Sequence, residues 1–401
     1  MSFEQTPRAM RPIITLTGCR NAGKSSLLNA LCGEDIAIVS AQAGTTTDAV
    51  AKAYELLPLG PVTFYDTAGL DDTSALGQQR IRASKRILAK TDLSLLVVAE
   101  AGLTHFDKQI LEALKASKTP VIVVFNKADT ISVSETDKAF CQAENLPFIS
   151  VSAKTKTDID ALKKLIIDHI PEQTKQQTPL LGDIIHPKDK VVLVAPIDES
   201  APKNRLILPQ VQVLRELLDL NASAFVCQPE ELKDVLLSLK ESPRLVICDS
   251  QAVLPVAQTV PETIELTTFS ILFARYKGDL QTFVTGAKKI DTLKDGSKIL
   301  IAEACSHHTQ GDDIAKVKIP NLLKKYTQKT LDFSFCNGAD FPENLASYDL
   351  VIHCGGCMIN QKEMMSRLKK CTDISTFITN YGVAISKAQG VLDRVIRPFG
   401  F

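Results

Sequence analysis

Short apolar runs alternate with longer stretches of helical spacing along almost the whole chain, which is the pattern of layered strands and helices in an α/β fold. In the first part of the chain, helical stretches stand between most of the apolar runs. The strands expected there are residues 11–18, 62–66, 93–99, 120–125 and 147–151.

A polar segment bracketed by prolines, residues 171–179, interrupts this alternation and is typical of a linker. Two further blocks of strands and helices follow it. Their expected strands are residues 190–197, 223–228, 244–250, 298–305, 331–336 and 348–354, with a last strand near 376–386. Their expected helices are residues 211–220, 229–240, 269–293 and 362–370. Since 401 residues are enough for three modules, we predict domains at 1–172, 191–265 and 266–401, with a linker at 173–190.

Composition and charge narrow the class of protein. The chain is 45% hydrophobic and 23% charged, which is ordinary for a globular protein. Its 46 basic and 46 acidic side chains cancel, which argues against a mainly electrostatic surface for nucleic acid or an anionic membrane. No apolar run has the length of a membrane span and the first residues lack a signal-peptide pattern, so we expect a cytoplasmic protein. In that compartment the ten cysteines are expected to be buried thiols or metal ligands.

The sharpest motif is a phosphate-binding loop at residues 18–25, where GCRNAGKS fits the pattern G-x-x-x-x-G-K-[ST]. It follows an apolar strand and precedes a helical stretch, which is the context that such a loop requires. Its glycines let backbone N–H groups turn toward phosphate at the N-terminus of the helix. Lys24 is expected to neutralise charge on the β- and γ-phosphates, and Ser25 to ligate Mg²⁺.

Four more motifs follow in the order of a guanine-nucleotide site. Asp66, in the sequence DTAG, is expected to hold Mg²⁺ through water, and the N–H of Gly69 to sense the γ-phosphate; residues 44–48 (GTTTD) suit a mobile switch. Asp129, in NKAD, is expected to accept two hydrogen bonds that guanine offers and adenine does not, and the N–H of Ala153, in SAK, to donate to guanine O6. Motifs at successive strand ends match the ligand edge of an open α/β sheet. The residues expected to contact the nucleotide are Gly18, Asn21, Ala22, Gly23, Lys24, Ser25, Ser26, Thr45, Thr46, Asp66, Gly69, Asn126, Lys127, Asp129, Ser152, Ala153 and Lys154.

Residues 11–170 resemble the GTPase domains of the Era and tRNA-modification branch, through NAGKSS at residues 21–26 and GTTxD at 44–48. The resemblance implies that Thr46 is the switch threonine on Mg²⁺ and that Asn21 holds an activating K⁺. Leu70 stands where many small GTPases have a water-orienting glutamine, and leucine cannot orient water by hydrogen bonding. We therefore expect slow, K⁺-stimulated GTP hydrolysis. The expected catalytic residues are Lys24, Thr46, Asp66, Gly69 and Asn21.

The third block contains a second constellation, of cysteine and histidine. The sequence CSHH at 305–308 ends one expected strand, and HCGGC at 353–357 ends another. If both strands belong to one parallel sheet, the two motifs emerge at the same edge and converge. Cys305, Cys354 and Cys357 then offer three thiolates to a thiophilic metal, with His307 and His353 beside them.

The residue pattern alone leaves several interpretations of this constellation open. Buried thiols with surface histidines, a zinc site of Cys₃His type, a redox dithiol and an iron–sulfur cluster on three cysteines all use these residues. With a cluster, the fourth iron position is open to His307, His353, a carboxylate, water or an incoming group. The isolated cysteines expected to be core thiols are Cys141, Cys227, Cys248, Cys336 and Cys371, and Cys336 is the candidate exception because it also ends an expected strand.

The two sets of motifs together resemble the FeFe-hydrogenase maturation GTPase family. The resemblance rests on C-x-H, a gap of 45 residues and then H-C-x-x-C, placed after a GTPase domain and a middle domain, and it covers essentially the whole chain. It implies a 4Fe–4S cluster on Cys305, Cys354 and Cys357 and a middle dimerisation domain. It also implies a scaffold or carrier for the binuclear iron subcluster, which radical-SAM maturases make and apo FeFe-hydrogenase receives.

The expected fold is therefore α/β in three modules: a P-loop GTPase domain, a dimerisation domain and an iron–sulfur cluster-binding domain. The expected cofactors are GTP, Mg²⁺, K⁺ and the 4Fe–4S cluster, with the binuclear iron subcluster as transient cargo. The expected partners are the radical-SAM maturases, the apo-hydrogenase and a second copy of the chain, and neither nucleic acid nor a membrane is expected. The alternative is an RNA- or ribosome-acting Era-like GTPase with a zinc-binding C-terminal domain, which requires a basic face that the zero net charge speaks against.

Overall fold

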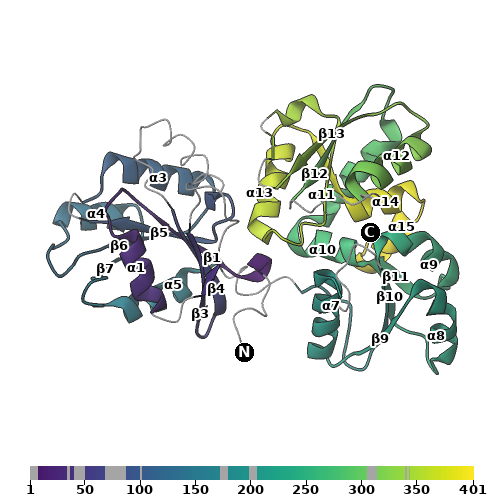
Figure 1. The fold of residues 1–401 in the computed structure, drawn as a ribbon, viewed down its shortest axis with the longest axis horizontal. Helices are drawn as coiled ribbons and strands as arrows, with labels where there is room; N and C mark the ends of the chain where they lie inside the picture. The colour runs from purple at the N-terminus through teal and green to yellow at the C-terminus, as the bar shows by residue number, and fades with distance from the viewer. Residues whose placement is uncertain are drawn as a thin grey trace. The chain divides into compact units, whose positions relative to one another are not determined.

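The structure, a computed structural model, describes residues 8–33, 37–39, 50–67, 87–99, 102–171, 179–197, 206–304, 314–338, 341–342 and 344–401. The chain divides into two compact units, Met1–Gln177 and Thr178–Phe401, and each is described by itself (Figure 1). None of the described helices combines the length and the apolar content that crossing a bilayer requires.

The first unit is built on a seven-stranded sheet with the strand order β2-β3-β4-β1-β5-β6-β7. β3 runs antiparallel to β2 and β4, and the other neighbouring strands pair in parallel. The strands are β1 (Ile13–Thr17), β2 (Ala37–Val39), β3 (Val50–Leu56), β4 (Gly60–Asp66), β5 (Leu93–Val98), β6 (Val121–Phe125) and β7 (Phe148–Ser150). The helices are η2 (Arg8–Met10), α1 (Lys24–Cys32), α3 (His105–Ala116), α4 (Glu135–Ala143) and α5 (Ile159–His169). The five predicted strands correspond to β1, β4, β5, β6 and β7, whereas the sequence pattern did not indicate β2 or β3.

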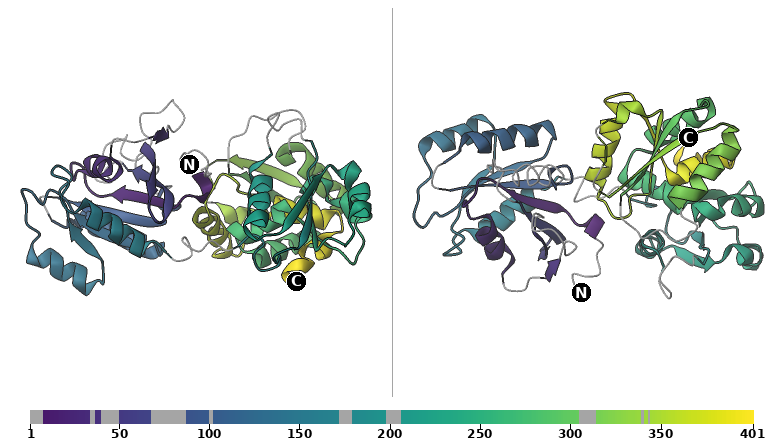
Figure 2. Two further views of the ribbon diagram at one scale, coloured as in Figure 1. Left: turned by 90° about the horizontal axis from the view of Figure 1, so that it is seen from below. Right: turned by 45° about the horizontal axis from the view of Figure 1, so that its top comes forward.

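Helices cover both faces of this sheet (Figure 2). β5 reads LSLLVV and is buried throughout, because alternate side chains enter opposite cores. Leu95 packs in the core that α1 and α5 close, and Leu96 in the core that α3 and α4 close. α3 begins with a capping box. The Thr104 hydroxyl accepts the N–H of Asp107 at 3.2 Å, and the Asp107 carboxylate accepts the N–H of Thr104 at 3.0 Å.

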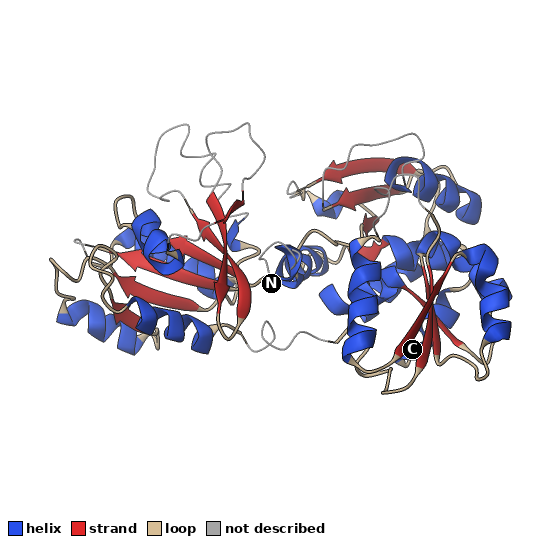
Figure 3. Ribbon diagram, turned by 60° about the horizontal axis from the view of Figure 1, so that its bottom comes forward, coloured by secondary structure: helices blue, strands red, loops and turns tan. Residues whose placement is uncertain are grey.

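Two four-stranded parallel sheets form the second unit, with the orders β11-β10-β8-β9 and β13-β12-β14-β15. Several of their strands are continuous apolar runs, because helices shield the sheet on both sides (Figure 3). The strands are β8 (Lys190–Val194), β9 (Ser223–Cys227), β10 (Leu245–Cys248), β11 (Glu265–Thr268), β12 (Lys298–Glu303), β13 (Asp332–Asn337), β14 (Leu350–His353) and β15 (Phe377–Asn380). The α-helices are α7 (Leu208–Asp219), α8 (Leu232–Ser238), α9 (Val253–Thr259), α10 (Phe269–Lys277), α11 (Leu280–Lys288), α12 (Ile319–Thr327), α13 (Gln361–Thr372), α14 (Tyr381–Ala388) and α15 (Leu392–Ile396). The short helices are η3 (Pro229–Glu231), η4 (Ser250–Ala252), η5 (Lys289–Thr292), η6 (Ile314–Lys318), η7 (Leu345–Ser347) and η8 (Arg397–Phe399).

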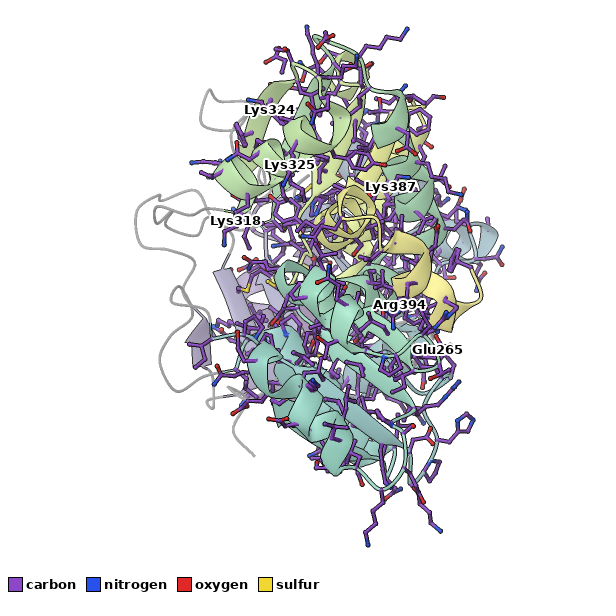
Figure 4. The ribbon with its side chains drawn as sticks, turned by 90° about the vertical axis from the view of Figure 1, so that its right-hand side faces the viewer. Glu265, Lys318, Lys324, Lys325, Lys387 and Arg394 are labelled. Carbon is purple, nitrogen blue, oxygen red and sulfur yellow. The ribbon has the colours of Figure 1, made fainter. Side chains whose placement is uncertain are left out.

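The two sheets of the second unit share one apolar core, which includes Val246 of β10, Ile271 of α10 and Ile301 of β12. Hydrogen bonds of Arg394 also connect α15 to α9 and the residues after it. Its guanidinium donates to the carbonyls of Ala257, Val260 and Pro261 at 2.5, 2.6 and 2.9 Å. Figure 4 shows Arg394 near Glu265 of β11. The second and third blocks of the sequence therefore fold against each other.

Two elements expected in the third block differ from the structure. The helical stretch 269–293 breaks at Gly278, because the carboxylate of Asp279 caps α11 by accepting the N–H of Thr282 at 3.0 Å. The strand expected near 376–386 ends at Asn380, whose side chain accepts the N–H of Val383 at 2.9 Å and begins α14. In both places a single capping side chain starts a new helix inside an apolar stretch. The expected helix is therefore divided, and the expected strand is confirmed only over Phe377–Asn380.

Candidate functional site

The phosphate-binding loop leaves the carboxyl end of β1 and enters α1, as the sequence predicted. Gly18 has φ +129°, and a Cβ atom there would lie 2.3 Å from the carbonyl oxygen of Val97. Gly23 has φ +88°, and a Cβ there would lie 2.3 Å from Nδ2 of Asn126. Both positions therefore require glycine, for the backbone conformation and for the space.

Lys24 folds back over this loop. Its Nζ atom donates to the carbonyl oxygens of Gly18 at 2.9 Å and Cys19 at 2.7 Å, and the residue is buried. The positive charge thus lies in the concave side of the loop, where a phosphate group is expected.

The two residues predicted to act on Mg²⁺ from α1 and β4 meet each other. The hydroxyl of Ser25 donates a hydrogen bond to the carboxylate of Asp66, across 41 residues of sequence. The strand that carries Asp66 is fixed by the next residue, because the hydroxyl of Thr67 donates to the carbonyl of Leu16 at 2.7 Å. A hydroxyl at the start of α1 and a carboxylate at the end of β4 are a suitable oxygen set for Mg²⁺.

Asn126 joins the phosphate loop to the predicted base-binding motifs. It is buried at the end of β6, where Nδ2 donates to the carbonyl of Ala22 at 3.0 Å and Oδ1 accepts the N–H of Ala153 at 3.1 Å. Its side chain therefore holds three motifs in register, a role that the motif alone did not specify.

Asp129, the residue predicted to read guanine, is exposed and oriented by its neighbour. The buried hydroxyl of Ser152 donates to the Asp129 carboxylate at 2.6 Å and accepts the N–H of Thr155 at 3.2 Å. This hydroxyl holds the pKa of Asp129 below its usual value, with Lys154 and Lys127 contributing. An ionised carboxylate facing solvent is ready to accept the two N–H groups of a guanine edge.

Other predicted nucleotide contacts lie around this site. Asn21, Ser26 and Lys154 are exposed, and Asn21 has a left-handed backbone with φ +60°. The thiol of Cys19, which sequence reasoning left without a role, lies 3.4 Å from the hydroxyl of Thr104 at the start of α3. The predicted switch and γ-phosphate residues Thr45, Thr46 and Gly69 lie outside the described residues, as does Leu70.

The cysteine motif of the third block lies at the carboxyl edge of the last sheet. β12 and β14 are parallel neighbours, with Ala302 paired to His353, so the condition for convergence of the two motifs is met. The backbone N–H of Ala304 donates to the sulfur of Cys354 at 3.1 Å, and the N–H of Cys354 donates to the carbonyl of Ala302 at 2.8 Å. Ala304 directly precedes Cys305, so the chain approaches the first motif from beside the sulfur of Cys354.

A buried lysine, which the sequence pattern did not indicate, lies beneath residues 354–359, the cysteine loop. Lys277 is 1% exposed, and its Nζ donates to the carbonyls of Gly356 at 2.9 Å, Cys357 at 3.2 Å and Ile359 at 2.9 Å. Burial lowers its pKa to about 8, and the nearby cysteines act in the opposite sense. The signal in the sequence was its position four residues after Phe273, on the apolar face of a helix.

His353 is buried, and both of its ring nitrogens have partners. Nε2 lies 3.0 Å from Nη1 of Arg367, and Nδ1 lies 2.7 Å from the carbonyl of Cys354. Burial and the charge of Arg367 lower the pKa of His353 to about 3. His353 as a fourth iron ligand stays a prediction, and ligation through either nitrogen requires that one of these hydrogen bonds break.

Of the three predicted thiolate ligands, Cys354 and Cys357 lie within the described residues and Cys305 does not. Cys354 and Cys357 are partly exposed as residues. The thiol group of Cys354 is nevertheless buried, which raises its pKa. Cys305 and His307 lie outside the described residues. Within the described ranges no three His, Cys, Asp or Glu side chains gather as a metal site.

Three family models match consecutive parts of the chain. A model of 50S ribosome-binding GTPases matches residues 13–127. A model of the hydrogen maturase F dimerization domain matches residues 180–278, and one of the hydrogen maturase F tetramerization domain matches residues 281–398. The matches confirm the predicted GTPase domain and the α/β modules that follow it.

Curated relatives are similar to the first part of the chain. GTPase Era of Heliobacterium modesticaldum is 36% identical over 165 residues, which are 40% of this chain and 55% of that protein. The tRNA modification GTPase MnmE of Chromobacterium violaceum is 39% identical over 160 residues, 39% of this chain and 34% of that protein. The chain thus spans about half of the first relative and a third of the second. A crystal structure of Era from Aquifex aeolicus bound to GDP and AlF₄⁻ is 23% identical, covers 54% of this chain and 92% of its own, and has a TM-score of 0.35.

Proposed function

The chain belongs to the hydrogen maturase F family, and from this premise we propose that it is a GTP-hydrolysing scaffold that binds a 4Fe–4S cluster and delivers the binuclear iron subcluster to apo FeFe-hydrogenase. The first domain hydrolyses GTP. The two domains that follow form the oligomer and hold the cluster. The observation that supports the proposal is the hydrogen bond from the N–H of Ala304, the residue before Cys305, to the sulfur of Cys354, in the segment that the tetramerization-domain model matches.

The GTPase site supports hydrolysis by positioning and charge. Lys24 would compensate the charge of the β- and γ-phosphates, Ser25 would ligate Mg²⁺, and Asp66 would hold that ion through water. Asp129 and Ala153 select guanine. Thr46 completes the Mg²⁺ shell and Asn21 holds K⁺, as in the GTPases that this domain resembles. Because the leucine side chain at position 70 cannot orient water by hydrogen bonding, a K⁺ ion held by Asn21 would supply the charge that speeds hydrolysis.

The residues at the carboxyl edge of the last sheet fit an iron–sulfur cluster. Cys354 and Cys357 offer soft thiolates on one glycine-containing turn, and Cys305 follows Ala304 directly. The N–H bond to the sulfur of Cys354 is of the kind that supports clusters, and the charge of Lys277 lies under the same turn. When bound, the cluster supplies an iron with an open position, at which a carried iron fragment can be held and released.

Metal analysis tests the cluster assignment. We expect protein purified without oxygen and reconstituted with iron and sulfide to hold about four irons per chain and to give a cluster EPR signal after reduction. Cys305→Ser and Cys357→Ser should lose most of that iron, whereas Cys336→Ser, on the neighbouring strand β13, should keep it. Zinc in place of iron would contradict the proposal and favour the alternative of an Era-like GTPase with a zinc domain.

Monovalent cations test the proposed hydrolysis mechanism. GTP turnover in K⁺ should exceed turnover in Na⁺ at equal ionic strength, and Asn21→Ala should remove the difference. Equal turnover in the two salts would contradict a role for K⁺. Delivery is tested by incubating loaded protein with apo FeFe-hydrogenase and measuring hydrogen evolution, with GDP and a non-hydrolysable GTP analogue compared in parallel.

A further inference from the structure

The three N–H donors of Lys277 match three carbonyl oxygens of the cysteine loop. An ammonium group has three N–H donors, and the carbonyls of Gly356, Cys357 and Ile359 lie 2.9, 3.2 and 2.9 Å from Nζ. These three carbonyls belong to four consecutive residues, so one side chain fixes the path of the whole turn.

The charge of Lys277 is enclosed. The residue is 1% exposed, and the ring of Phe273 covers one side at 5.8 Å from Nζ. No described carboxylate forms an ion pair with it, whereas the cysteines whose charge acts on it are Cys357 and Cys354. Burying a charge is unfavourable unless an opposite charge compensates it, and here the groups able to do so are thiolates.

Lys277 and the loop lie in different parts of the chain. Lys277 ends α10, within the segment that matches the dimerization domain, whereas residues 356–359 lie within the segment that matches the tetramerization domain. α10 also packs against α7 and α13. The hydrogen bonds of Lys277 therefore connect the first of these domains to the turn that carries two cysteines.

We infer that Lys277 is a positioning residue for the cluster: it shapes the turn of Cys354 and Cys357 and places a positive charge beneath the bound cluster. This inference rests on the proposed cluster site. Two effects of the lysine can be separated. Its three hydrogen bonds hold the turn closed whether or not a cluster is present, and its charge stabilises the reduced cluster, which carries one more negative charge than the oxidised one.

Two substitutions separate these effects. Lys277→Met removes both the charge and the bonds. Lys277→Arg keeps the charge, but the planar guanidinium cannot donate to three converging carbonyls as an ammonium does. Lys387→Met is the matched control, since Lys387 lies on α14 of the same unit, is partly buried and pairs with Asp291 at 2.8 Å (Figure 4).

The first measurement uses the apo protein. Alkylation of Cys354 and Cys357 by iodoacetamide, followed by peptide mass spectrometry, should be about tenfold faster in both Lys277 variants than in the wild type and the Lys387→Met control. The second measurement is an EPR-monitored reductive titration of the reconstituted protein. The midpoint potential should shift to more negative values in Lys277→Met and stay near the wild-type value in Lys277→Arg.

Each outcome decides the inference. Wild-type alkylation rates in both Lys277 variants, or an unchanged potential in Lys277→Met, would overturn it. If circular dichroism shows that Lys277→Met is unfolded, the alkylation rate of Lys277→Arg decides whether Lys277 shapes the cysteine turn. If the wild type itself takes up no iron, the proposed function fails, while the apo measurement still tests whether Lys277 holds the cysteine turn.

Discussion

Arg367 donates a hydrogen bond from Nη1 to Nε2 of His353 over 3.0 Å, and both side chains are buried. Because a guanidinium can only donate, Nε2 must accept, and the ring proton lies on Nδ1, where it is donated to the carbonyl of Cys354 at 2.7 Å. The same guanidinium donates to the carbonyl of Gly338 at 2.9 Å and pairs with Glu363 at 2.7 Å. The imidazole next to the cysteine turn is therefore a neutral member of a buried polar network.

Arg367→Met should destabilise the protein by about 3 kcal/mol, because it leaves Nε2 of His353 and the half-buried carboxylate of Glu363 without their partner. Urea denaturation monitored by circular dichroism measures the loss. Lys369→Met is the control on the exposed side of the same helix α13, and its free energy of unfolding should stay within about 0.5 kcal/mol of the wild type. Equal stability of the two variants would show that the network contributes nothing.

The same geometry makes a prediction about the fourth iron ligand. A nitrogen hyperfine coupling in the pulsed EPR spectrum of the reduced cluster, where the wild type shows one, should persist in His353→Gln, because ligation by His353 requires it to lose a hydrogen bond. Total iron and the rate of cluster loss are measured beside it, since His353→Gln also removes the bond to the carbonyl of Cys354. Disappearance of the coupling with full iron content would identify His353 as the ligand.

Gly23→Ala should abolish nucleotide binding. The substitution places a Cβ 2.3 Å from Nδ2 of Asn126 and forces alanine into a backbone with φ +88°, so the loop cannot keep the path that holds phosphate. Gly400→Ala is the matched control, because Gly400 has nearly the same left-handed backbone as Gly23, with φ +79° and ψ 25°, while nothing lies within 4 Å of the new Cβ. Calorimetric titration with GDP should show binding in the control alone, and binding in Gly23→Ala would refute the steric argument.

The nucleotide site could largely be predicted from the sequence, because its motifs are short and each stands at a strand end. Asp129 and Ser152 lie where the motifs put them, yet the hydrogen bond between them and the clamp formed by Asn126 became visible only in the structure. The fold was predictable where apolar periodicity was strong, as in β5 and β6. It was wrong where one side chain decides the outcome, as at Asn380, whose cap turns an apolar stretch from strand into helix.

Lys277 could not be predicted in the same way. Its partners lie 79 to 82 residues further along the chain, and no local pattern states that a lysine at the end of an apolar helix will reach them. The cysteine motifs show the reverse case. The sequence predicted a shared sheet edge only if the two strands belong to one parallel sheet, and the parallel pairing of β12 with β14 meets that condition. Arg367 and its hydrogen bond to His353 had no such signal in the sequence.

Ser152→Ala should weaken GDP binding about tenfold, because Asp129 loses the hydroxyl that orients its carboxylate toward the base. The effect should appear for GDP and GTP alike, since both share the guanine base. Ser134→Ala is a close control: the Ser134 hydroxyl also donates to a carboxylate, that of Asp137 at 2.7 Å, but at the start of α4. That control should lower the melting temperature without changing the affinity for GDP, and a wild-type affinity in Ser152→Ala would rule out its role.

The buried cysteines should resist alkylation until the pH is far above neutral. Burial raises the pKa of Cys32 and Cys141 to about 11 and that of Cys371 to about 12, so at pH 8 about one Cys32 thiol in a thousand is a thiolate, the form that reacts. Because the pKa is raised, reactivity should increase about tenfold for each pH unit between 8 and 10, as long as the protein stays folded. Iodoacetamide labelling with peptide mass spectrometry, using the partly exposed Cys336 as internal reference, measures this. Labelling of Cys371 at pH 8 as fast as that of Cys336 in folded protein would show that α13 opens readily, and full labelling in urea confirms that each thiol is free to react.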